Sequence, residues 1–164
     1  MSSNSGPGFL KTGTGALNLT NCLVFAQSND AVRITTGTVV IGSCTFANNL
    51  GWGISNGVGL VSVINSIAWG NTNGGMTNCT TVSYSDSQNS IGGPGNTSGD
   101  PNFTSGSKGD FHLISGSPCI NSGSNEAWMA GALDLEGNPR KFGGSVDMGC
   151  YESFSGPGTI IILK

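Results

Sequence analysis

The chain is poor in charge, and its few charges form no stripe of one sign. Charged residues make up 9% of the sequence, and six Lys and Arg against nine Asp and Glu give a formal net charge of −3. Without a basic stripe, the sequence predicts no nucleic-acid partner. No apolar run approaches the ~20 residues that a membrane-spanning helix needs, so no membrane span is expected in this chain.

Motifs for metal binding or nucleophilic catalysis are also scarce. There is one His, and the five Cys include no CxxC pair, which argues against a zinc site. His112 has no Ser or Cys nucleophile context, so we interpret it as structural. The start, MSSNSGPG, has no signal-peptide core. Either the chain is cytosolic or it is a fragment of a longer exported protein, and we favour the fragment, with an extracellular or cell-surface location.

The chain does contain a repeat. GALNLTNC from Gly15, GTVVIGSC from Gly37 and GLVSVINS from Gly59 share one pattern at a spacing of 22 residues. Alternate positions in each copy are aliphatic, which is the pattern of a strand with one buried face. A fixed period of this length is the mark of a solenoid.

Each period holds three short strand-like stretches separated by Gly, Asn and Ser, residues that favour turns. The sequence therefore predicts an all-β chain folded as a right-handed parallel β-helix of three to four coils, with about 22 residues per coil. Equivalent positions should stack, and we expect Asn21, Ser43 and Asn65 to hydrogen-bond along the axis at one turn. The next match to Asn65 is Ser83, in a shorter last coil.

The second half of the chain has a different texture, and its motifs come in a definite order. They are DPNF (100–103), GDFHL (109–113), GSPCINSG (116–123), DLEGNPRK (134–141) and VDMGCYE (146–152). Together with NSIAWGNT (65–72), this series resembles the C-terminal module of bacterial cell-surface right-handed β-helix proteins of the pectin-lyase-like superfamily, of the kind found in choice-of-anchor proteins. Asn121 and Cys150 depart from that pattern, which usually has Asp and Ala there.

These observations divide the chain into four parts. We expect parallel β-helix coils over 1–89, a Gly/Pro-rich loop over 90–99, a C-terminal cap module over 100–154 and an apolar C-terminal strand over 155–164. The module is expected to cover the last coil, because the end of a solenoid exposes backbone groups and apolar core.

Two sets of residues in the second half are candidate sites. Asp134, Glu136 and Asp147 either form ion pairs and turn hydrogen bonds or build a calcium site, although DLEGN lacks the full ligand series of a calcium loop. No other cofactor is expected. Cys119 and Cys150 could form a disulfide if the module is exported, whereas Cys22 and Cys44 are expected to stack as a thiol ladder.

The coils carry one small charged group. Lys11 and Arg33 are assigned to the same column, and Asp30 lies close by in the sequence. The resemblance brings a lyase reaction into consideration, since pectate lyases use Asp-bound calcium and an Arg or Lys base on a β-helix face. Such chemistry needs several carboxylates and cations converging in a cleft, and these residues are too few. We therefore interpret them as a solvated face and expect no catalysis.

Trp52 and Trp69 are candidates for stacking against sugar rings, since the alternation places Trp69 on an outer face. The alternative is that the C-terminal module or a loop covers them. At the two ends, Phe9 and Leu10 in one strand and Ile160, Ile161 and Ile162 in another are apolar enough to pair, either within the chain or between copies as a head-to-tail filament.

Two functions fit the sequence. The first is a non-catalytic extracellular or cell-surface structural module for adhesion or self-assembly. The alternative is a carbohydrate-binding or polysaccharide-degrading module of the lyase-like class, with a polysaccharide as its partner.

Overall fold

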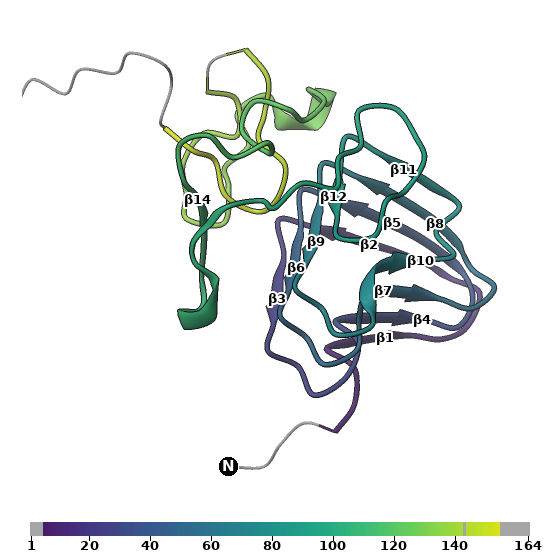
Figure 1. Cartoon of the computed structure of the whole chain (residues 1–164). Helices are drawn as coiled ribbons and strands as arrows, with labels where there is room; N and C mark the ends of the chain where they lie inside the picture. Colours follow the sequence, from purple (N-terminus) through teal and green to yellow (C-terminus); the bar gives the residue numbers. More distant parts are fainter. Residues whose placement is uncertain (1–4, 143, 155–164) are drawn as a thin grey trace, which may run out of the picture.

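The computed structural model describes residues 5–142 and 144–154, and it is an all-β parallel solenoid with a second, loop-rich part at its side (Figure 1). Twelve short strands form three parallel sheets of four strands each. The first sheet contains β1 (Phe9–Lys11), β4 (Val32–Ile34), β7 (Trp52–Asn56) and β10 (Gly74–Thr77). The second contains β2 (Ala16–Thr20), β5 (Thr38–Gly42), β8 (Leu60–Ile64) and β11 (Thr81–Ser83). The third contains β3 (Leu23–Phe25), β6 (Thr45–Ala47), β9 (Ile67–Trp69) and β12 (Asp86–Ser87).

Each coil contributes one strand to every sheet, which confirms the predicted solenoid. In the second sheet Leu17 pairs with Val39 and Val39 pairs with Val61, so the period is the one read from the sequence. The last coil is shorter, and there Val82 lies opposite Val63. About four turns are present, and the full turns contain about 22 residues.

The register of the first sheet differs by one residue from the sequence-based assignment. Leu10, and not Lys11, is the partner of Arg33, while Lys11 lies beside Ile34. The predicted column of Lys11 and Arg33 is therefore wrong. The Gly-rich turn after Lys11 has one residue more before the second sheet than its counterparts, and nothing in the local sequence marks this offset.

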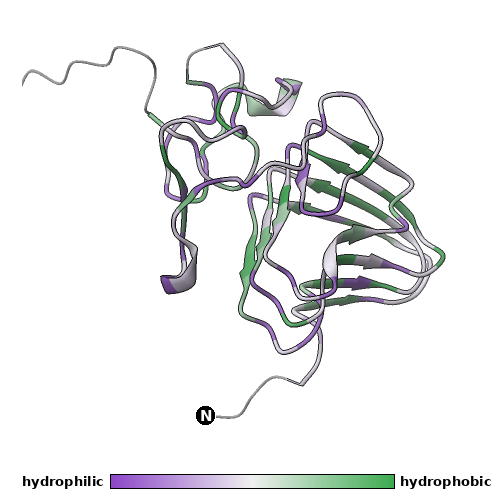
Figure 2. Ribbon diagram, in the orientation of Figure 1, coloured by the Kyte–Doolittle hydropathy of each residue, from purple (hydrophilic) through white to green (hydrophobic). Residues whose placement is uncertain are grey.

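The core lies inside the coils and is built from the stacked aliphatic columns. Val39, Ile41, Val61 and Ile54 are fully buried in it, as is Phe46 from the third sheet. Figure 2 shows the hydrophobic residues gathered on the solenoid strands, with polar residues at many of the turns between them. The alternation along each strand is therefore the source of the core, as the period-two pattern predicts.

Side-chain ladders run along the axis, but one position beyond the predicted column. The amide of Cys22 donates to Sγ of Cys44 (3.4 Å), and the amide of Cys44 donates to Oγ of Ser66 (3.2 Å). A second ladder joins Asn49 to Asn71, whose Oδ1 accepts the amide of Asn49 at 3.0 Å. The predicted thiol stack is thus confirmed, and it continues as a hydroxyl.

The expected axial ladder of Asn21, Ser43 and Asn65 is not formed. These residues take positive φ values of 53°, 52° and 52°, and Tyr84 of the last coil joins them at 47°. The equivalent of Asn65 is therefore Tyr84, and not Ser83 as predicted. In this left-handed conformation the side chains of Asn21 and Asn65 point away from the axis, toward the second half of the chain.

The end of the last coil is covered by residues 88–97, which we call the end segment. The carbonyl of Pro94 accepts the amide of Tyr84 (2.8 Å), and Thr97 exchanges backbone hydrogen bonds with Ser85 and Ser87. Asn89 bonds both backbone groups of Met76. The predicted Gly/Pro-rich loop over 90–99 is therefore the main part of the element that covers the free strand edges at this end.

The C-terminal module lies on the side of the solenoid and not across its last coil, which corrects the predicted cap. It contains β13 (Phe103–Ser105) and β14 (Asp110–Leu113), which are antiparallel, and the 3₁₀ turns η1 (Gly106–Lys108) and η2 (Ala127–Met129). Figure 1 shows it beside β3, β6 and β9.

The outer face of the third sheet explains this lateral position, because it is apolar. Phe25 contacts Phe111 with ring centroids 5.2 Å apart, and Ile67 forms a buried cluster with Leu113, Cys119 and Met148. Backbone contacts add to it, since the amide of Cys150 donates to the Thr45 hydroxyl. The strand predicted over 155–164 lies outside the described residues.

We expect Ile41→Ala to lower the free energy of unfolding by about 2–5 kcal/mol, because Ile41 is fully buried between two coils. Val40→Ala is the matched control, since its side chain lies on the outer face of the same strand and is exposed. Urea unfolding followed by circular dichroism measures both. A loss well below 1 kcal/mol for Ile41→Ala would contradict the stacked core.

Candidate functional site

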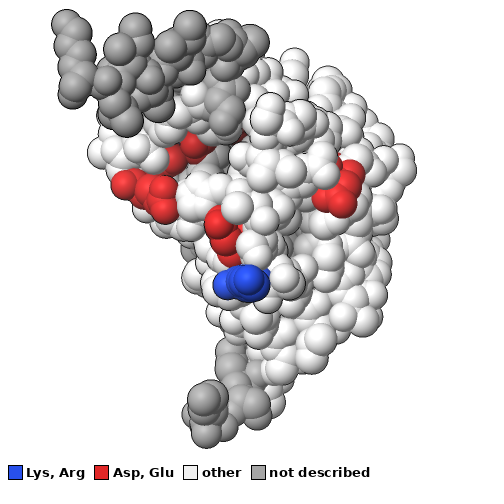
Figure 3. Space-filling view, turned by 60° about the vertical axis from the view of Figure 1, so that its left-hand side comes forward, with Lys and Arg blue, Asp and Glu red and all other residues white. Residues whose placement is uncertain are grey.

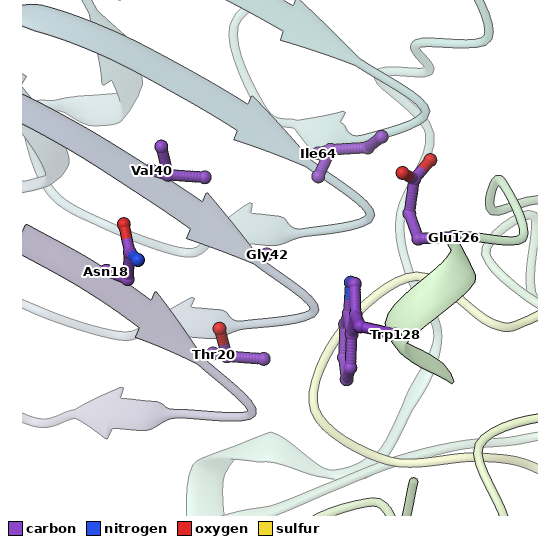
Figure 4. A pocket seen from close by; sticks show the side chains of 7 residues that line it. All are labelled: Asn18, Thr20, Val40, Gly42, Ile64, Glu126 and Trp128. Atoms are coloured by element: carbon purple, nitrogen blue, oxygen red, sulfur yellow. The ribbon is translucent and has the colours of Figure 1, made fainter. Parts of the chain in front are cut away.

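A groove lies between the second sheet and η2 on the described surface. It has a volume of about 470 Å³. Its lining residues come from three strands and from the C-terminal module: Asn18, Thr20, Val40, Gly42, Ile64, Glu126 and Trp128. Figure 4 shows Trp128 reaching from η2 toward the ends of β2 and β5, with Glu126 beyond it on the same turn.

The floor of the groove follows from the alternation along the strands. In β2 the side chains of Asn18 and Thr20 point outward, while Leu19 between them is buried. Gly42 is the neighbour of Thr20 on the next coil, and Ile64 follows Gly42. Since Gly42 has no side chain, the floor is hollowed at this rung.

The wall of the groove is held in place by a turn residue of the solenoid. The side-chain amide of Asn65 donates to the carbonyl of Ser124 (2.8 Å), and its Oδ1 accepts the amide of Ser124 (2.7 Å). Met129, at the end of η2, is buried. Trp128 is thus left half-exposed beside the sheet, 43% open to solvent.

Sequence reasoning did not select Trp128 or Glu126. Trp128 lies outside the repeat, and no period or motif assigns it to a face. The one signal available in the sequence was its residue type, since the chain has only three Trp and such aromatic side chains suit binding surfaces.

The two tryptophans chosen from the sequence lie elsewhere. Trp69 points outward, as predicted, but it packs against the cluster that joins the third sheet to the C-terminal module. Trp52 is partly buried at the start of β7, and its ring lies over Gly74 of the next coil. Neither lines the groove.

The predicted charged face is a structural corner in which Asp30 is buried and Arg33 stays partly exposed. Asp30 is buried, and its carboxylate accepts hydrogen bonds from Nε of Arg33 (2.8 Å), the Ser55 hydroxyl (2.6 Å) and the Trp52 amide (2.8 Å). Burial opposes ionisation of Asp30, but these donors lower its pKa below the usual value. Lys11 is separate, with its ammonium on the carbonyls of Thr12 and Gly13.

The three calcium candidates have different partners. The carboxylate of Asp134 accepts the backbone amides of Glu136, Asn138 and Glu152, and that of Asp147 accepts the amides of Asn121 and Ser153. Glu136 pairs with the imidazole of His112 at 3.0 Å. Among the described residues, no three His, Cys, Asp or Glu side chains are grouped so that they could hold a metal ion.

His112 bridges two carboxylates on the surface of the C-terminal module. Its Nδ1 lies 2.6 Å from Asp110 and its ring stacks on Tyr151, with centroids 4.2 Å apart. Partial burial would lower the pKa of His112, but the bonds to Asp110 and Glu136 outweigh it and raise the pKa. These contacts join β14 to the loops that follow, which fits the structural interpretation.

The C-terminal module also contains a buried ion pair. Arg140 is fully buried and lies 3.2 Å from the carboxylate of Glu152, and its guanidinium donates twice to the carbonyl of Gly149. The face of the molecule drawn in Figure 3 is mostly uncharged, with a few acidic groups and little positive charge.

Cys119 and Cys150 are both buried free thiols, so the predicted disulfide is not formed in the structure. Burial raises the pKa of Cys150 to about 12 and raises that of Cys119 as well, which keeps both protonated.

Asp86 is a buried carboxylate with weak partners. It lies fully buried in β12, and hydrogen bonding from the Cys119 thiol and the Ser87 amide favours its ionised form without outweighing the burial. Burial raises the pKa of Asp86 to about 7, and the nearby charge of Asp100 adds to this shift.

No protein-family model, curated protein or solved structure matches the chain. Its class is therefore defined by the fold alone, which is a parallel β-solenoid with a laterally attached module. The likeness to pectin-lyase-like cell-surface proteins stays a prediction. Within the described residues, no helix is long and apolar enough to cross a membrane.

We expect iodoacetamide to leave Cys44, Cys119 and Cys150 unmodified in the folded protein, because all three are buried. After unfolding without reductant, mass spectrometry should find all five cysteines alkylated. A product with three alkyl groups that gains two after reduction would instead show a Cys119–Cys150 disulfide.

We expect Asp86→Asn to stabilise the protein above about pH 7. In the wild type the folded-state pKa is raised, so the unfolded state loses its proton first, and stability falls as pH rises from about 4 to about 7. The variant has no titrating group at this position, so its stability does not fall over this pH range. Its free energy of unfolding should exceed that of the wild type by on the order of 2–4 kcal/mol at pH 8.

Urea unfolding between pH 4 and pH 8 measures the difference. Asp100→Asn is the comparison variant, since it removes only the neighbouring exposed charge and should lessen the pH-dependent fall without abolishing it. If the free energies of unfolding of the wild type and Asp86→Asn change with pH in parallel, the raised pKa of Asp86 is contradicted.

Proposed function

We propose that this chain is a non-catalytic structural module of an extracellular or cell-surface protein, and that it assembles through its first coil. The observation that carries the proposal is the exposure of inward-facing residues in that coil. Phe9 is 40% exposed, whereas its partner in the second coil, Val32, is 0% exposed. The same contrast separates Leu17, which is partly buried, from Val39, which is fully buried.

The strands of the first coil have neighbours on one side only. Among the described residues, β1, β2 and β3 each pair with a single strand, and they stand at the edge of their sheets. Proteins commonly protect such edges with charged side chains. Here Lys11 is the one charged residue between Gly8 and Asn29, and its ammonium is occupied by backbone carbonyls.

The two ends of the solenoid are not equivalent, which bears on the direction of assembly. The end segment 88–97 occupies the strand edges of the last coil, so a first coil stacked there would have to displace it. Pairing between the first coils of two copies requires no displacement. A twofold axis perpendicular to the solenoid would make their strands antiparallel and would close the assembly as a dimer.

The head-to-tail filament is the other arrangement considered. It requires residues 159–163, with Ile160, Ile161 and Ile162, to pair as a strand with the first coil of another copy, and this segment lies outside the described residues. Both arrangements use the first coil, but only the filament depends on the C-terminal strand.

We expect the wild type to self-associate and Leu10→Lys to be monomeric, because the new charge lies on an exposed position of the edge strand β1. Val58→Lys is the matched control, since Val58 is exposed in a turn of a middle coil and should leave association unchanged. Size-exclusion chromatography with light scattering measures the mass over a range of concentrations.

Deletion of residues 159–164 separates the two arrangements. A dimer that persists after the deletion supports pairing between first coils, and a polymer that dissociates supports the filament. A wild-type protein that stays monomeric at every concentration would overturn the assembly proposal.

A further inference from the structure

We propose that the groove between the second sheet and η2 binds an uncharged segment of polysaccharide, with Trp128 as the surface on which a sugar ring stacks. The groove is formed by the outer face of the second sheet, whereas the assembly proposal uses the backbone edges of the first coil, so this inference goes beyond the proposed function although both involve β2. It also differs from the sequence-based hypothesis, which assigned sugar stacking to Trp52 and Trp69.

The apolar part of the groove suits a sugar ring. Trp128 remains 43% exposed although its turn is anchored to the solenoid, and Val40 on the floor is also exposed. The C–H faces of pyranose rings are apolar and flat, and an exposed indole offers them a large, rigid surface. Figure 4 shows that Trp128 stands beside the strand ends, so its ring and the sheet border the same space.

The polar part supplies donors and acceptors at regular spacing. Asn18 and Thr20 point into the groove from alternate positions of β2. Along the axis, the column of Asn18 continues through Val40 to Ser62 and Thr81, whose hydroxyls hydrogen-bond to each other at 2.9 Å. Successive rungs are ~4.8 Å apart, which is close to the length of one sugar residue. A linear chain could therefore contact the groove and the hydroxyl column together.

The charge of the groove selects among polysaccharides. Its one ionisable lining residue is Glu126, and no Lys or Arg lines it. The Ser124 hydroxyl holds the Glu126 carboxylate through a hydrogen bond of 3.2 Å. A carboxylate accepts hydrogen bonds from sugar hydroxyls but repels the carboxylates of uronic acids. The expected ligand is thus a neutral glycan, and acidic chains such as polygalacturonate are disfavoured.

Native affinity electrophoresis tests the proposal with soluble polysaccharides cast in the gel. The neutral probes are hydroxyethyl cellulose, galactomannan, arabinoxylan and dextran, and the acidic probe is polygalacturonate. We expect retardation by at least one neutral probe and none by polygalacturonate. Trp128→Ala should weaken the apparent affinity by about tenfold or more, because an aromatic contact is removed.

Two further variants make the test specific. Gly42→Leu should also abolish retardation while leaving Trp128 in place, because a Cβ at Gly42 has room, with Ile64 Cγ2 as its nearest atom at 3.8 Å, and the rest of the side chain would fill the floor of the groove. Trp52→Ala is the matched control, since it removes a partly buried tryptophan of the first sheet that does not line the groove and should leave retardation unchanged. Circular dichroism confirms that each variant is folded.

Three results would overturn the proposal. They are retardation by none of the neutral probes, retardation by polygalacturonate alone, and retardation by a neutral probe that Trp128→Ala and Gly42→Leu leave unchanged. None of these results depends on self-association, which light scattering on the same samples measures separately.

Discussion

Hydrogen bonding between successive coils is the constraint on which the rest of this structure depends. Because each strand pairs in register with the same strand of the next coil, a residue is stacked between its own equivalents. Val39 lies between Leu17 and Val61, and the amide of Cys44 is satisfied by Ser66 one coil away. Stacked like charges would repel across the ~4.8 Å rung spacing, which is consistent with a solenoid so poor in charge.

The same stacking creates an apolar outer face that needs a cover. In the third sheet, Phe25 and Ile67 lie on the outside, and the C-terminal module packs against them. The turn residues Asn21 and Asn65 are freed from axial ladders by their left-handed backbone and bond this module instead. Lateral docking in turn brings Trp128 beside the second sheet, so the groove exists only because the two halves are joined in this way.

The C-terminal module is held together by many polar interactions between its loops. It has two short strands and two 3₁₀ turns, so few of its backbone groups are paired in regular structure. Asp134, Asp147 and the buried Arg140 satisfy backbone amides and carbonyls across its loops. Removing one partner of such a buried network leaves the other unsatisfied, which makes these charges structural rather than accessible to a ligand. The acidic motifs that suggested calcium are explained by this network in the structure.

The sequence by itself determined the solenoid, because a period of 22 residues and the alternation within it are local properties that any stacked coil must obey. It also determined that Trp69 points outward, since parity along a strand is enough for that. Only the tertiary structure decided the partner of Arg33, the lateral place of the C-terminal module and the pairing of Trp128 with the second sheet. These depend on loop lengths and on contacts between residues far apart in the chain, such as Asn65 and Ser124, for which a single sequence carries no periodic signal.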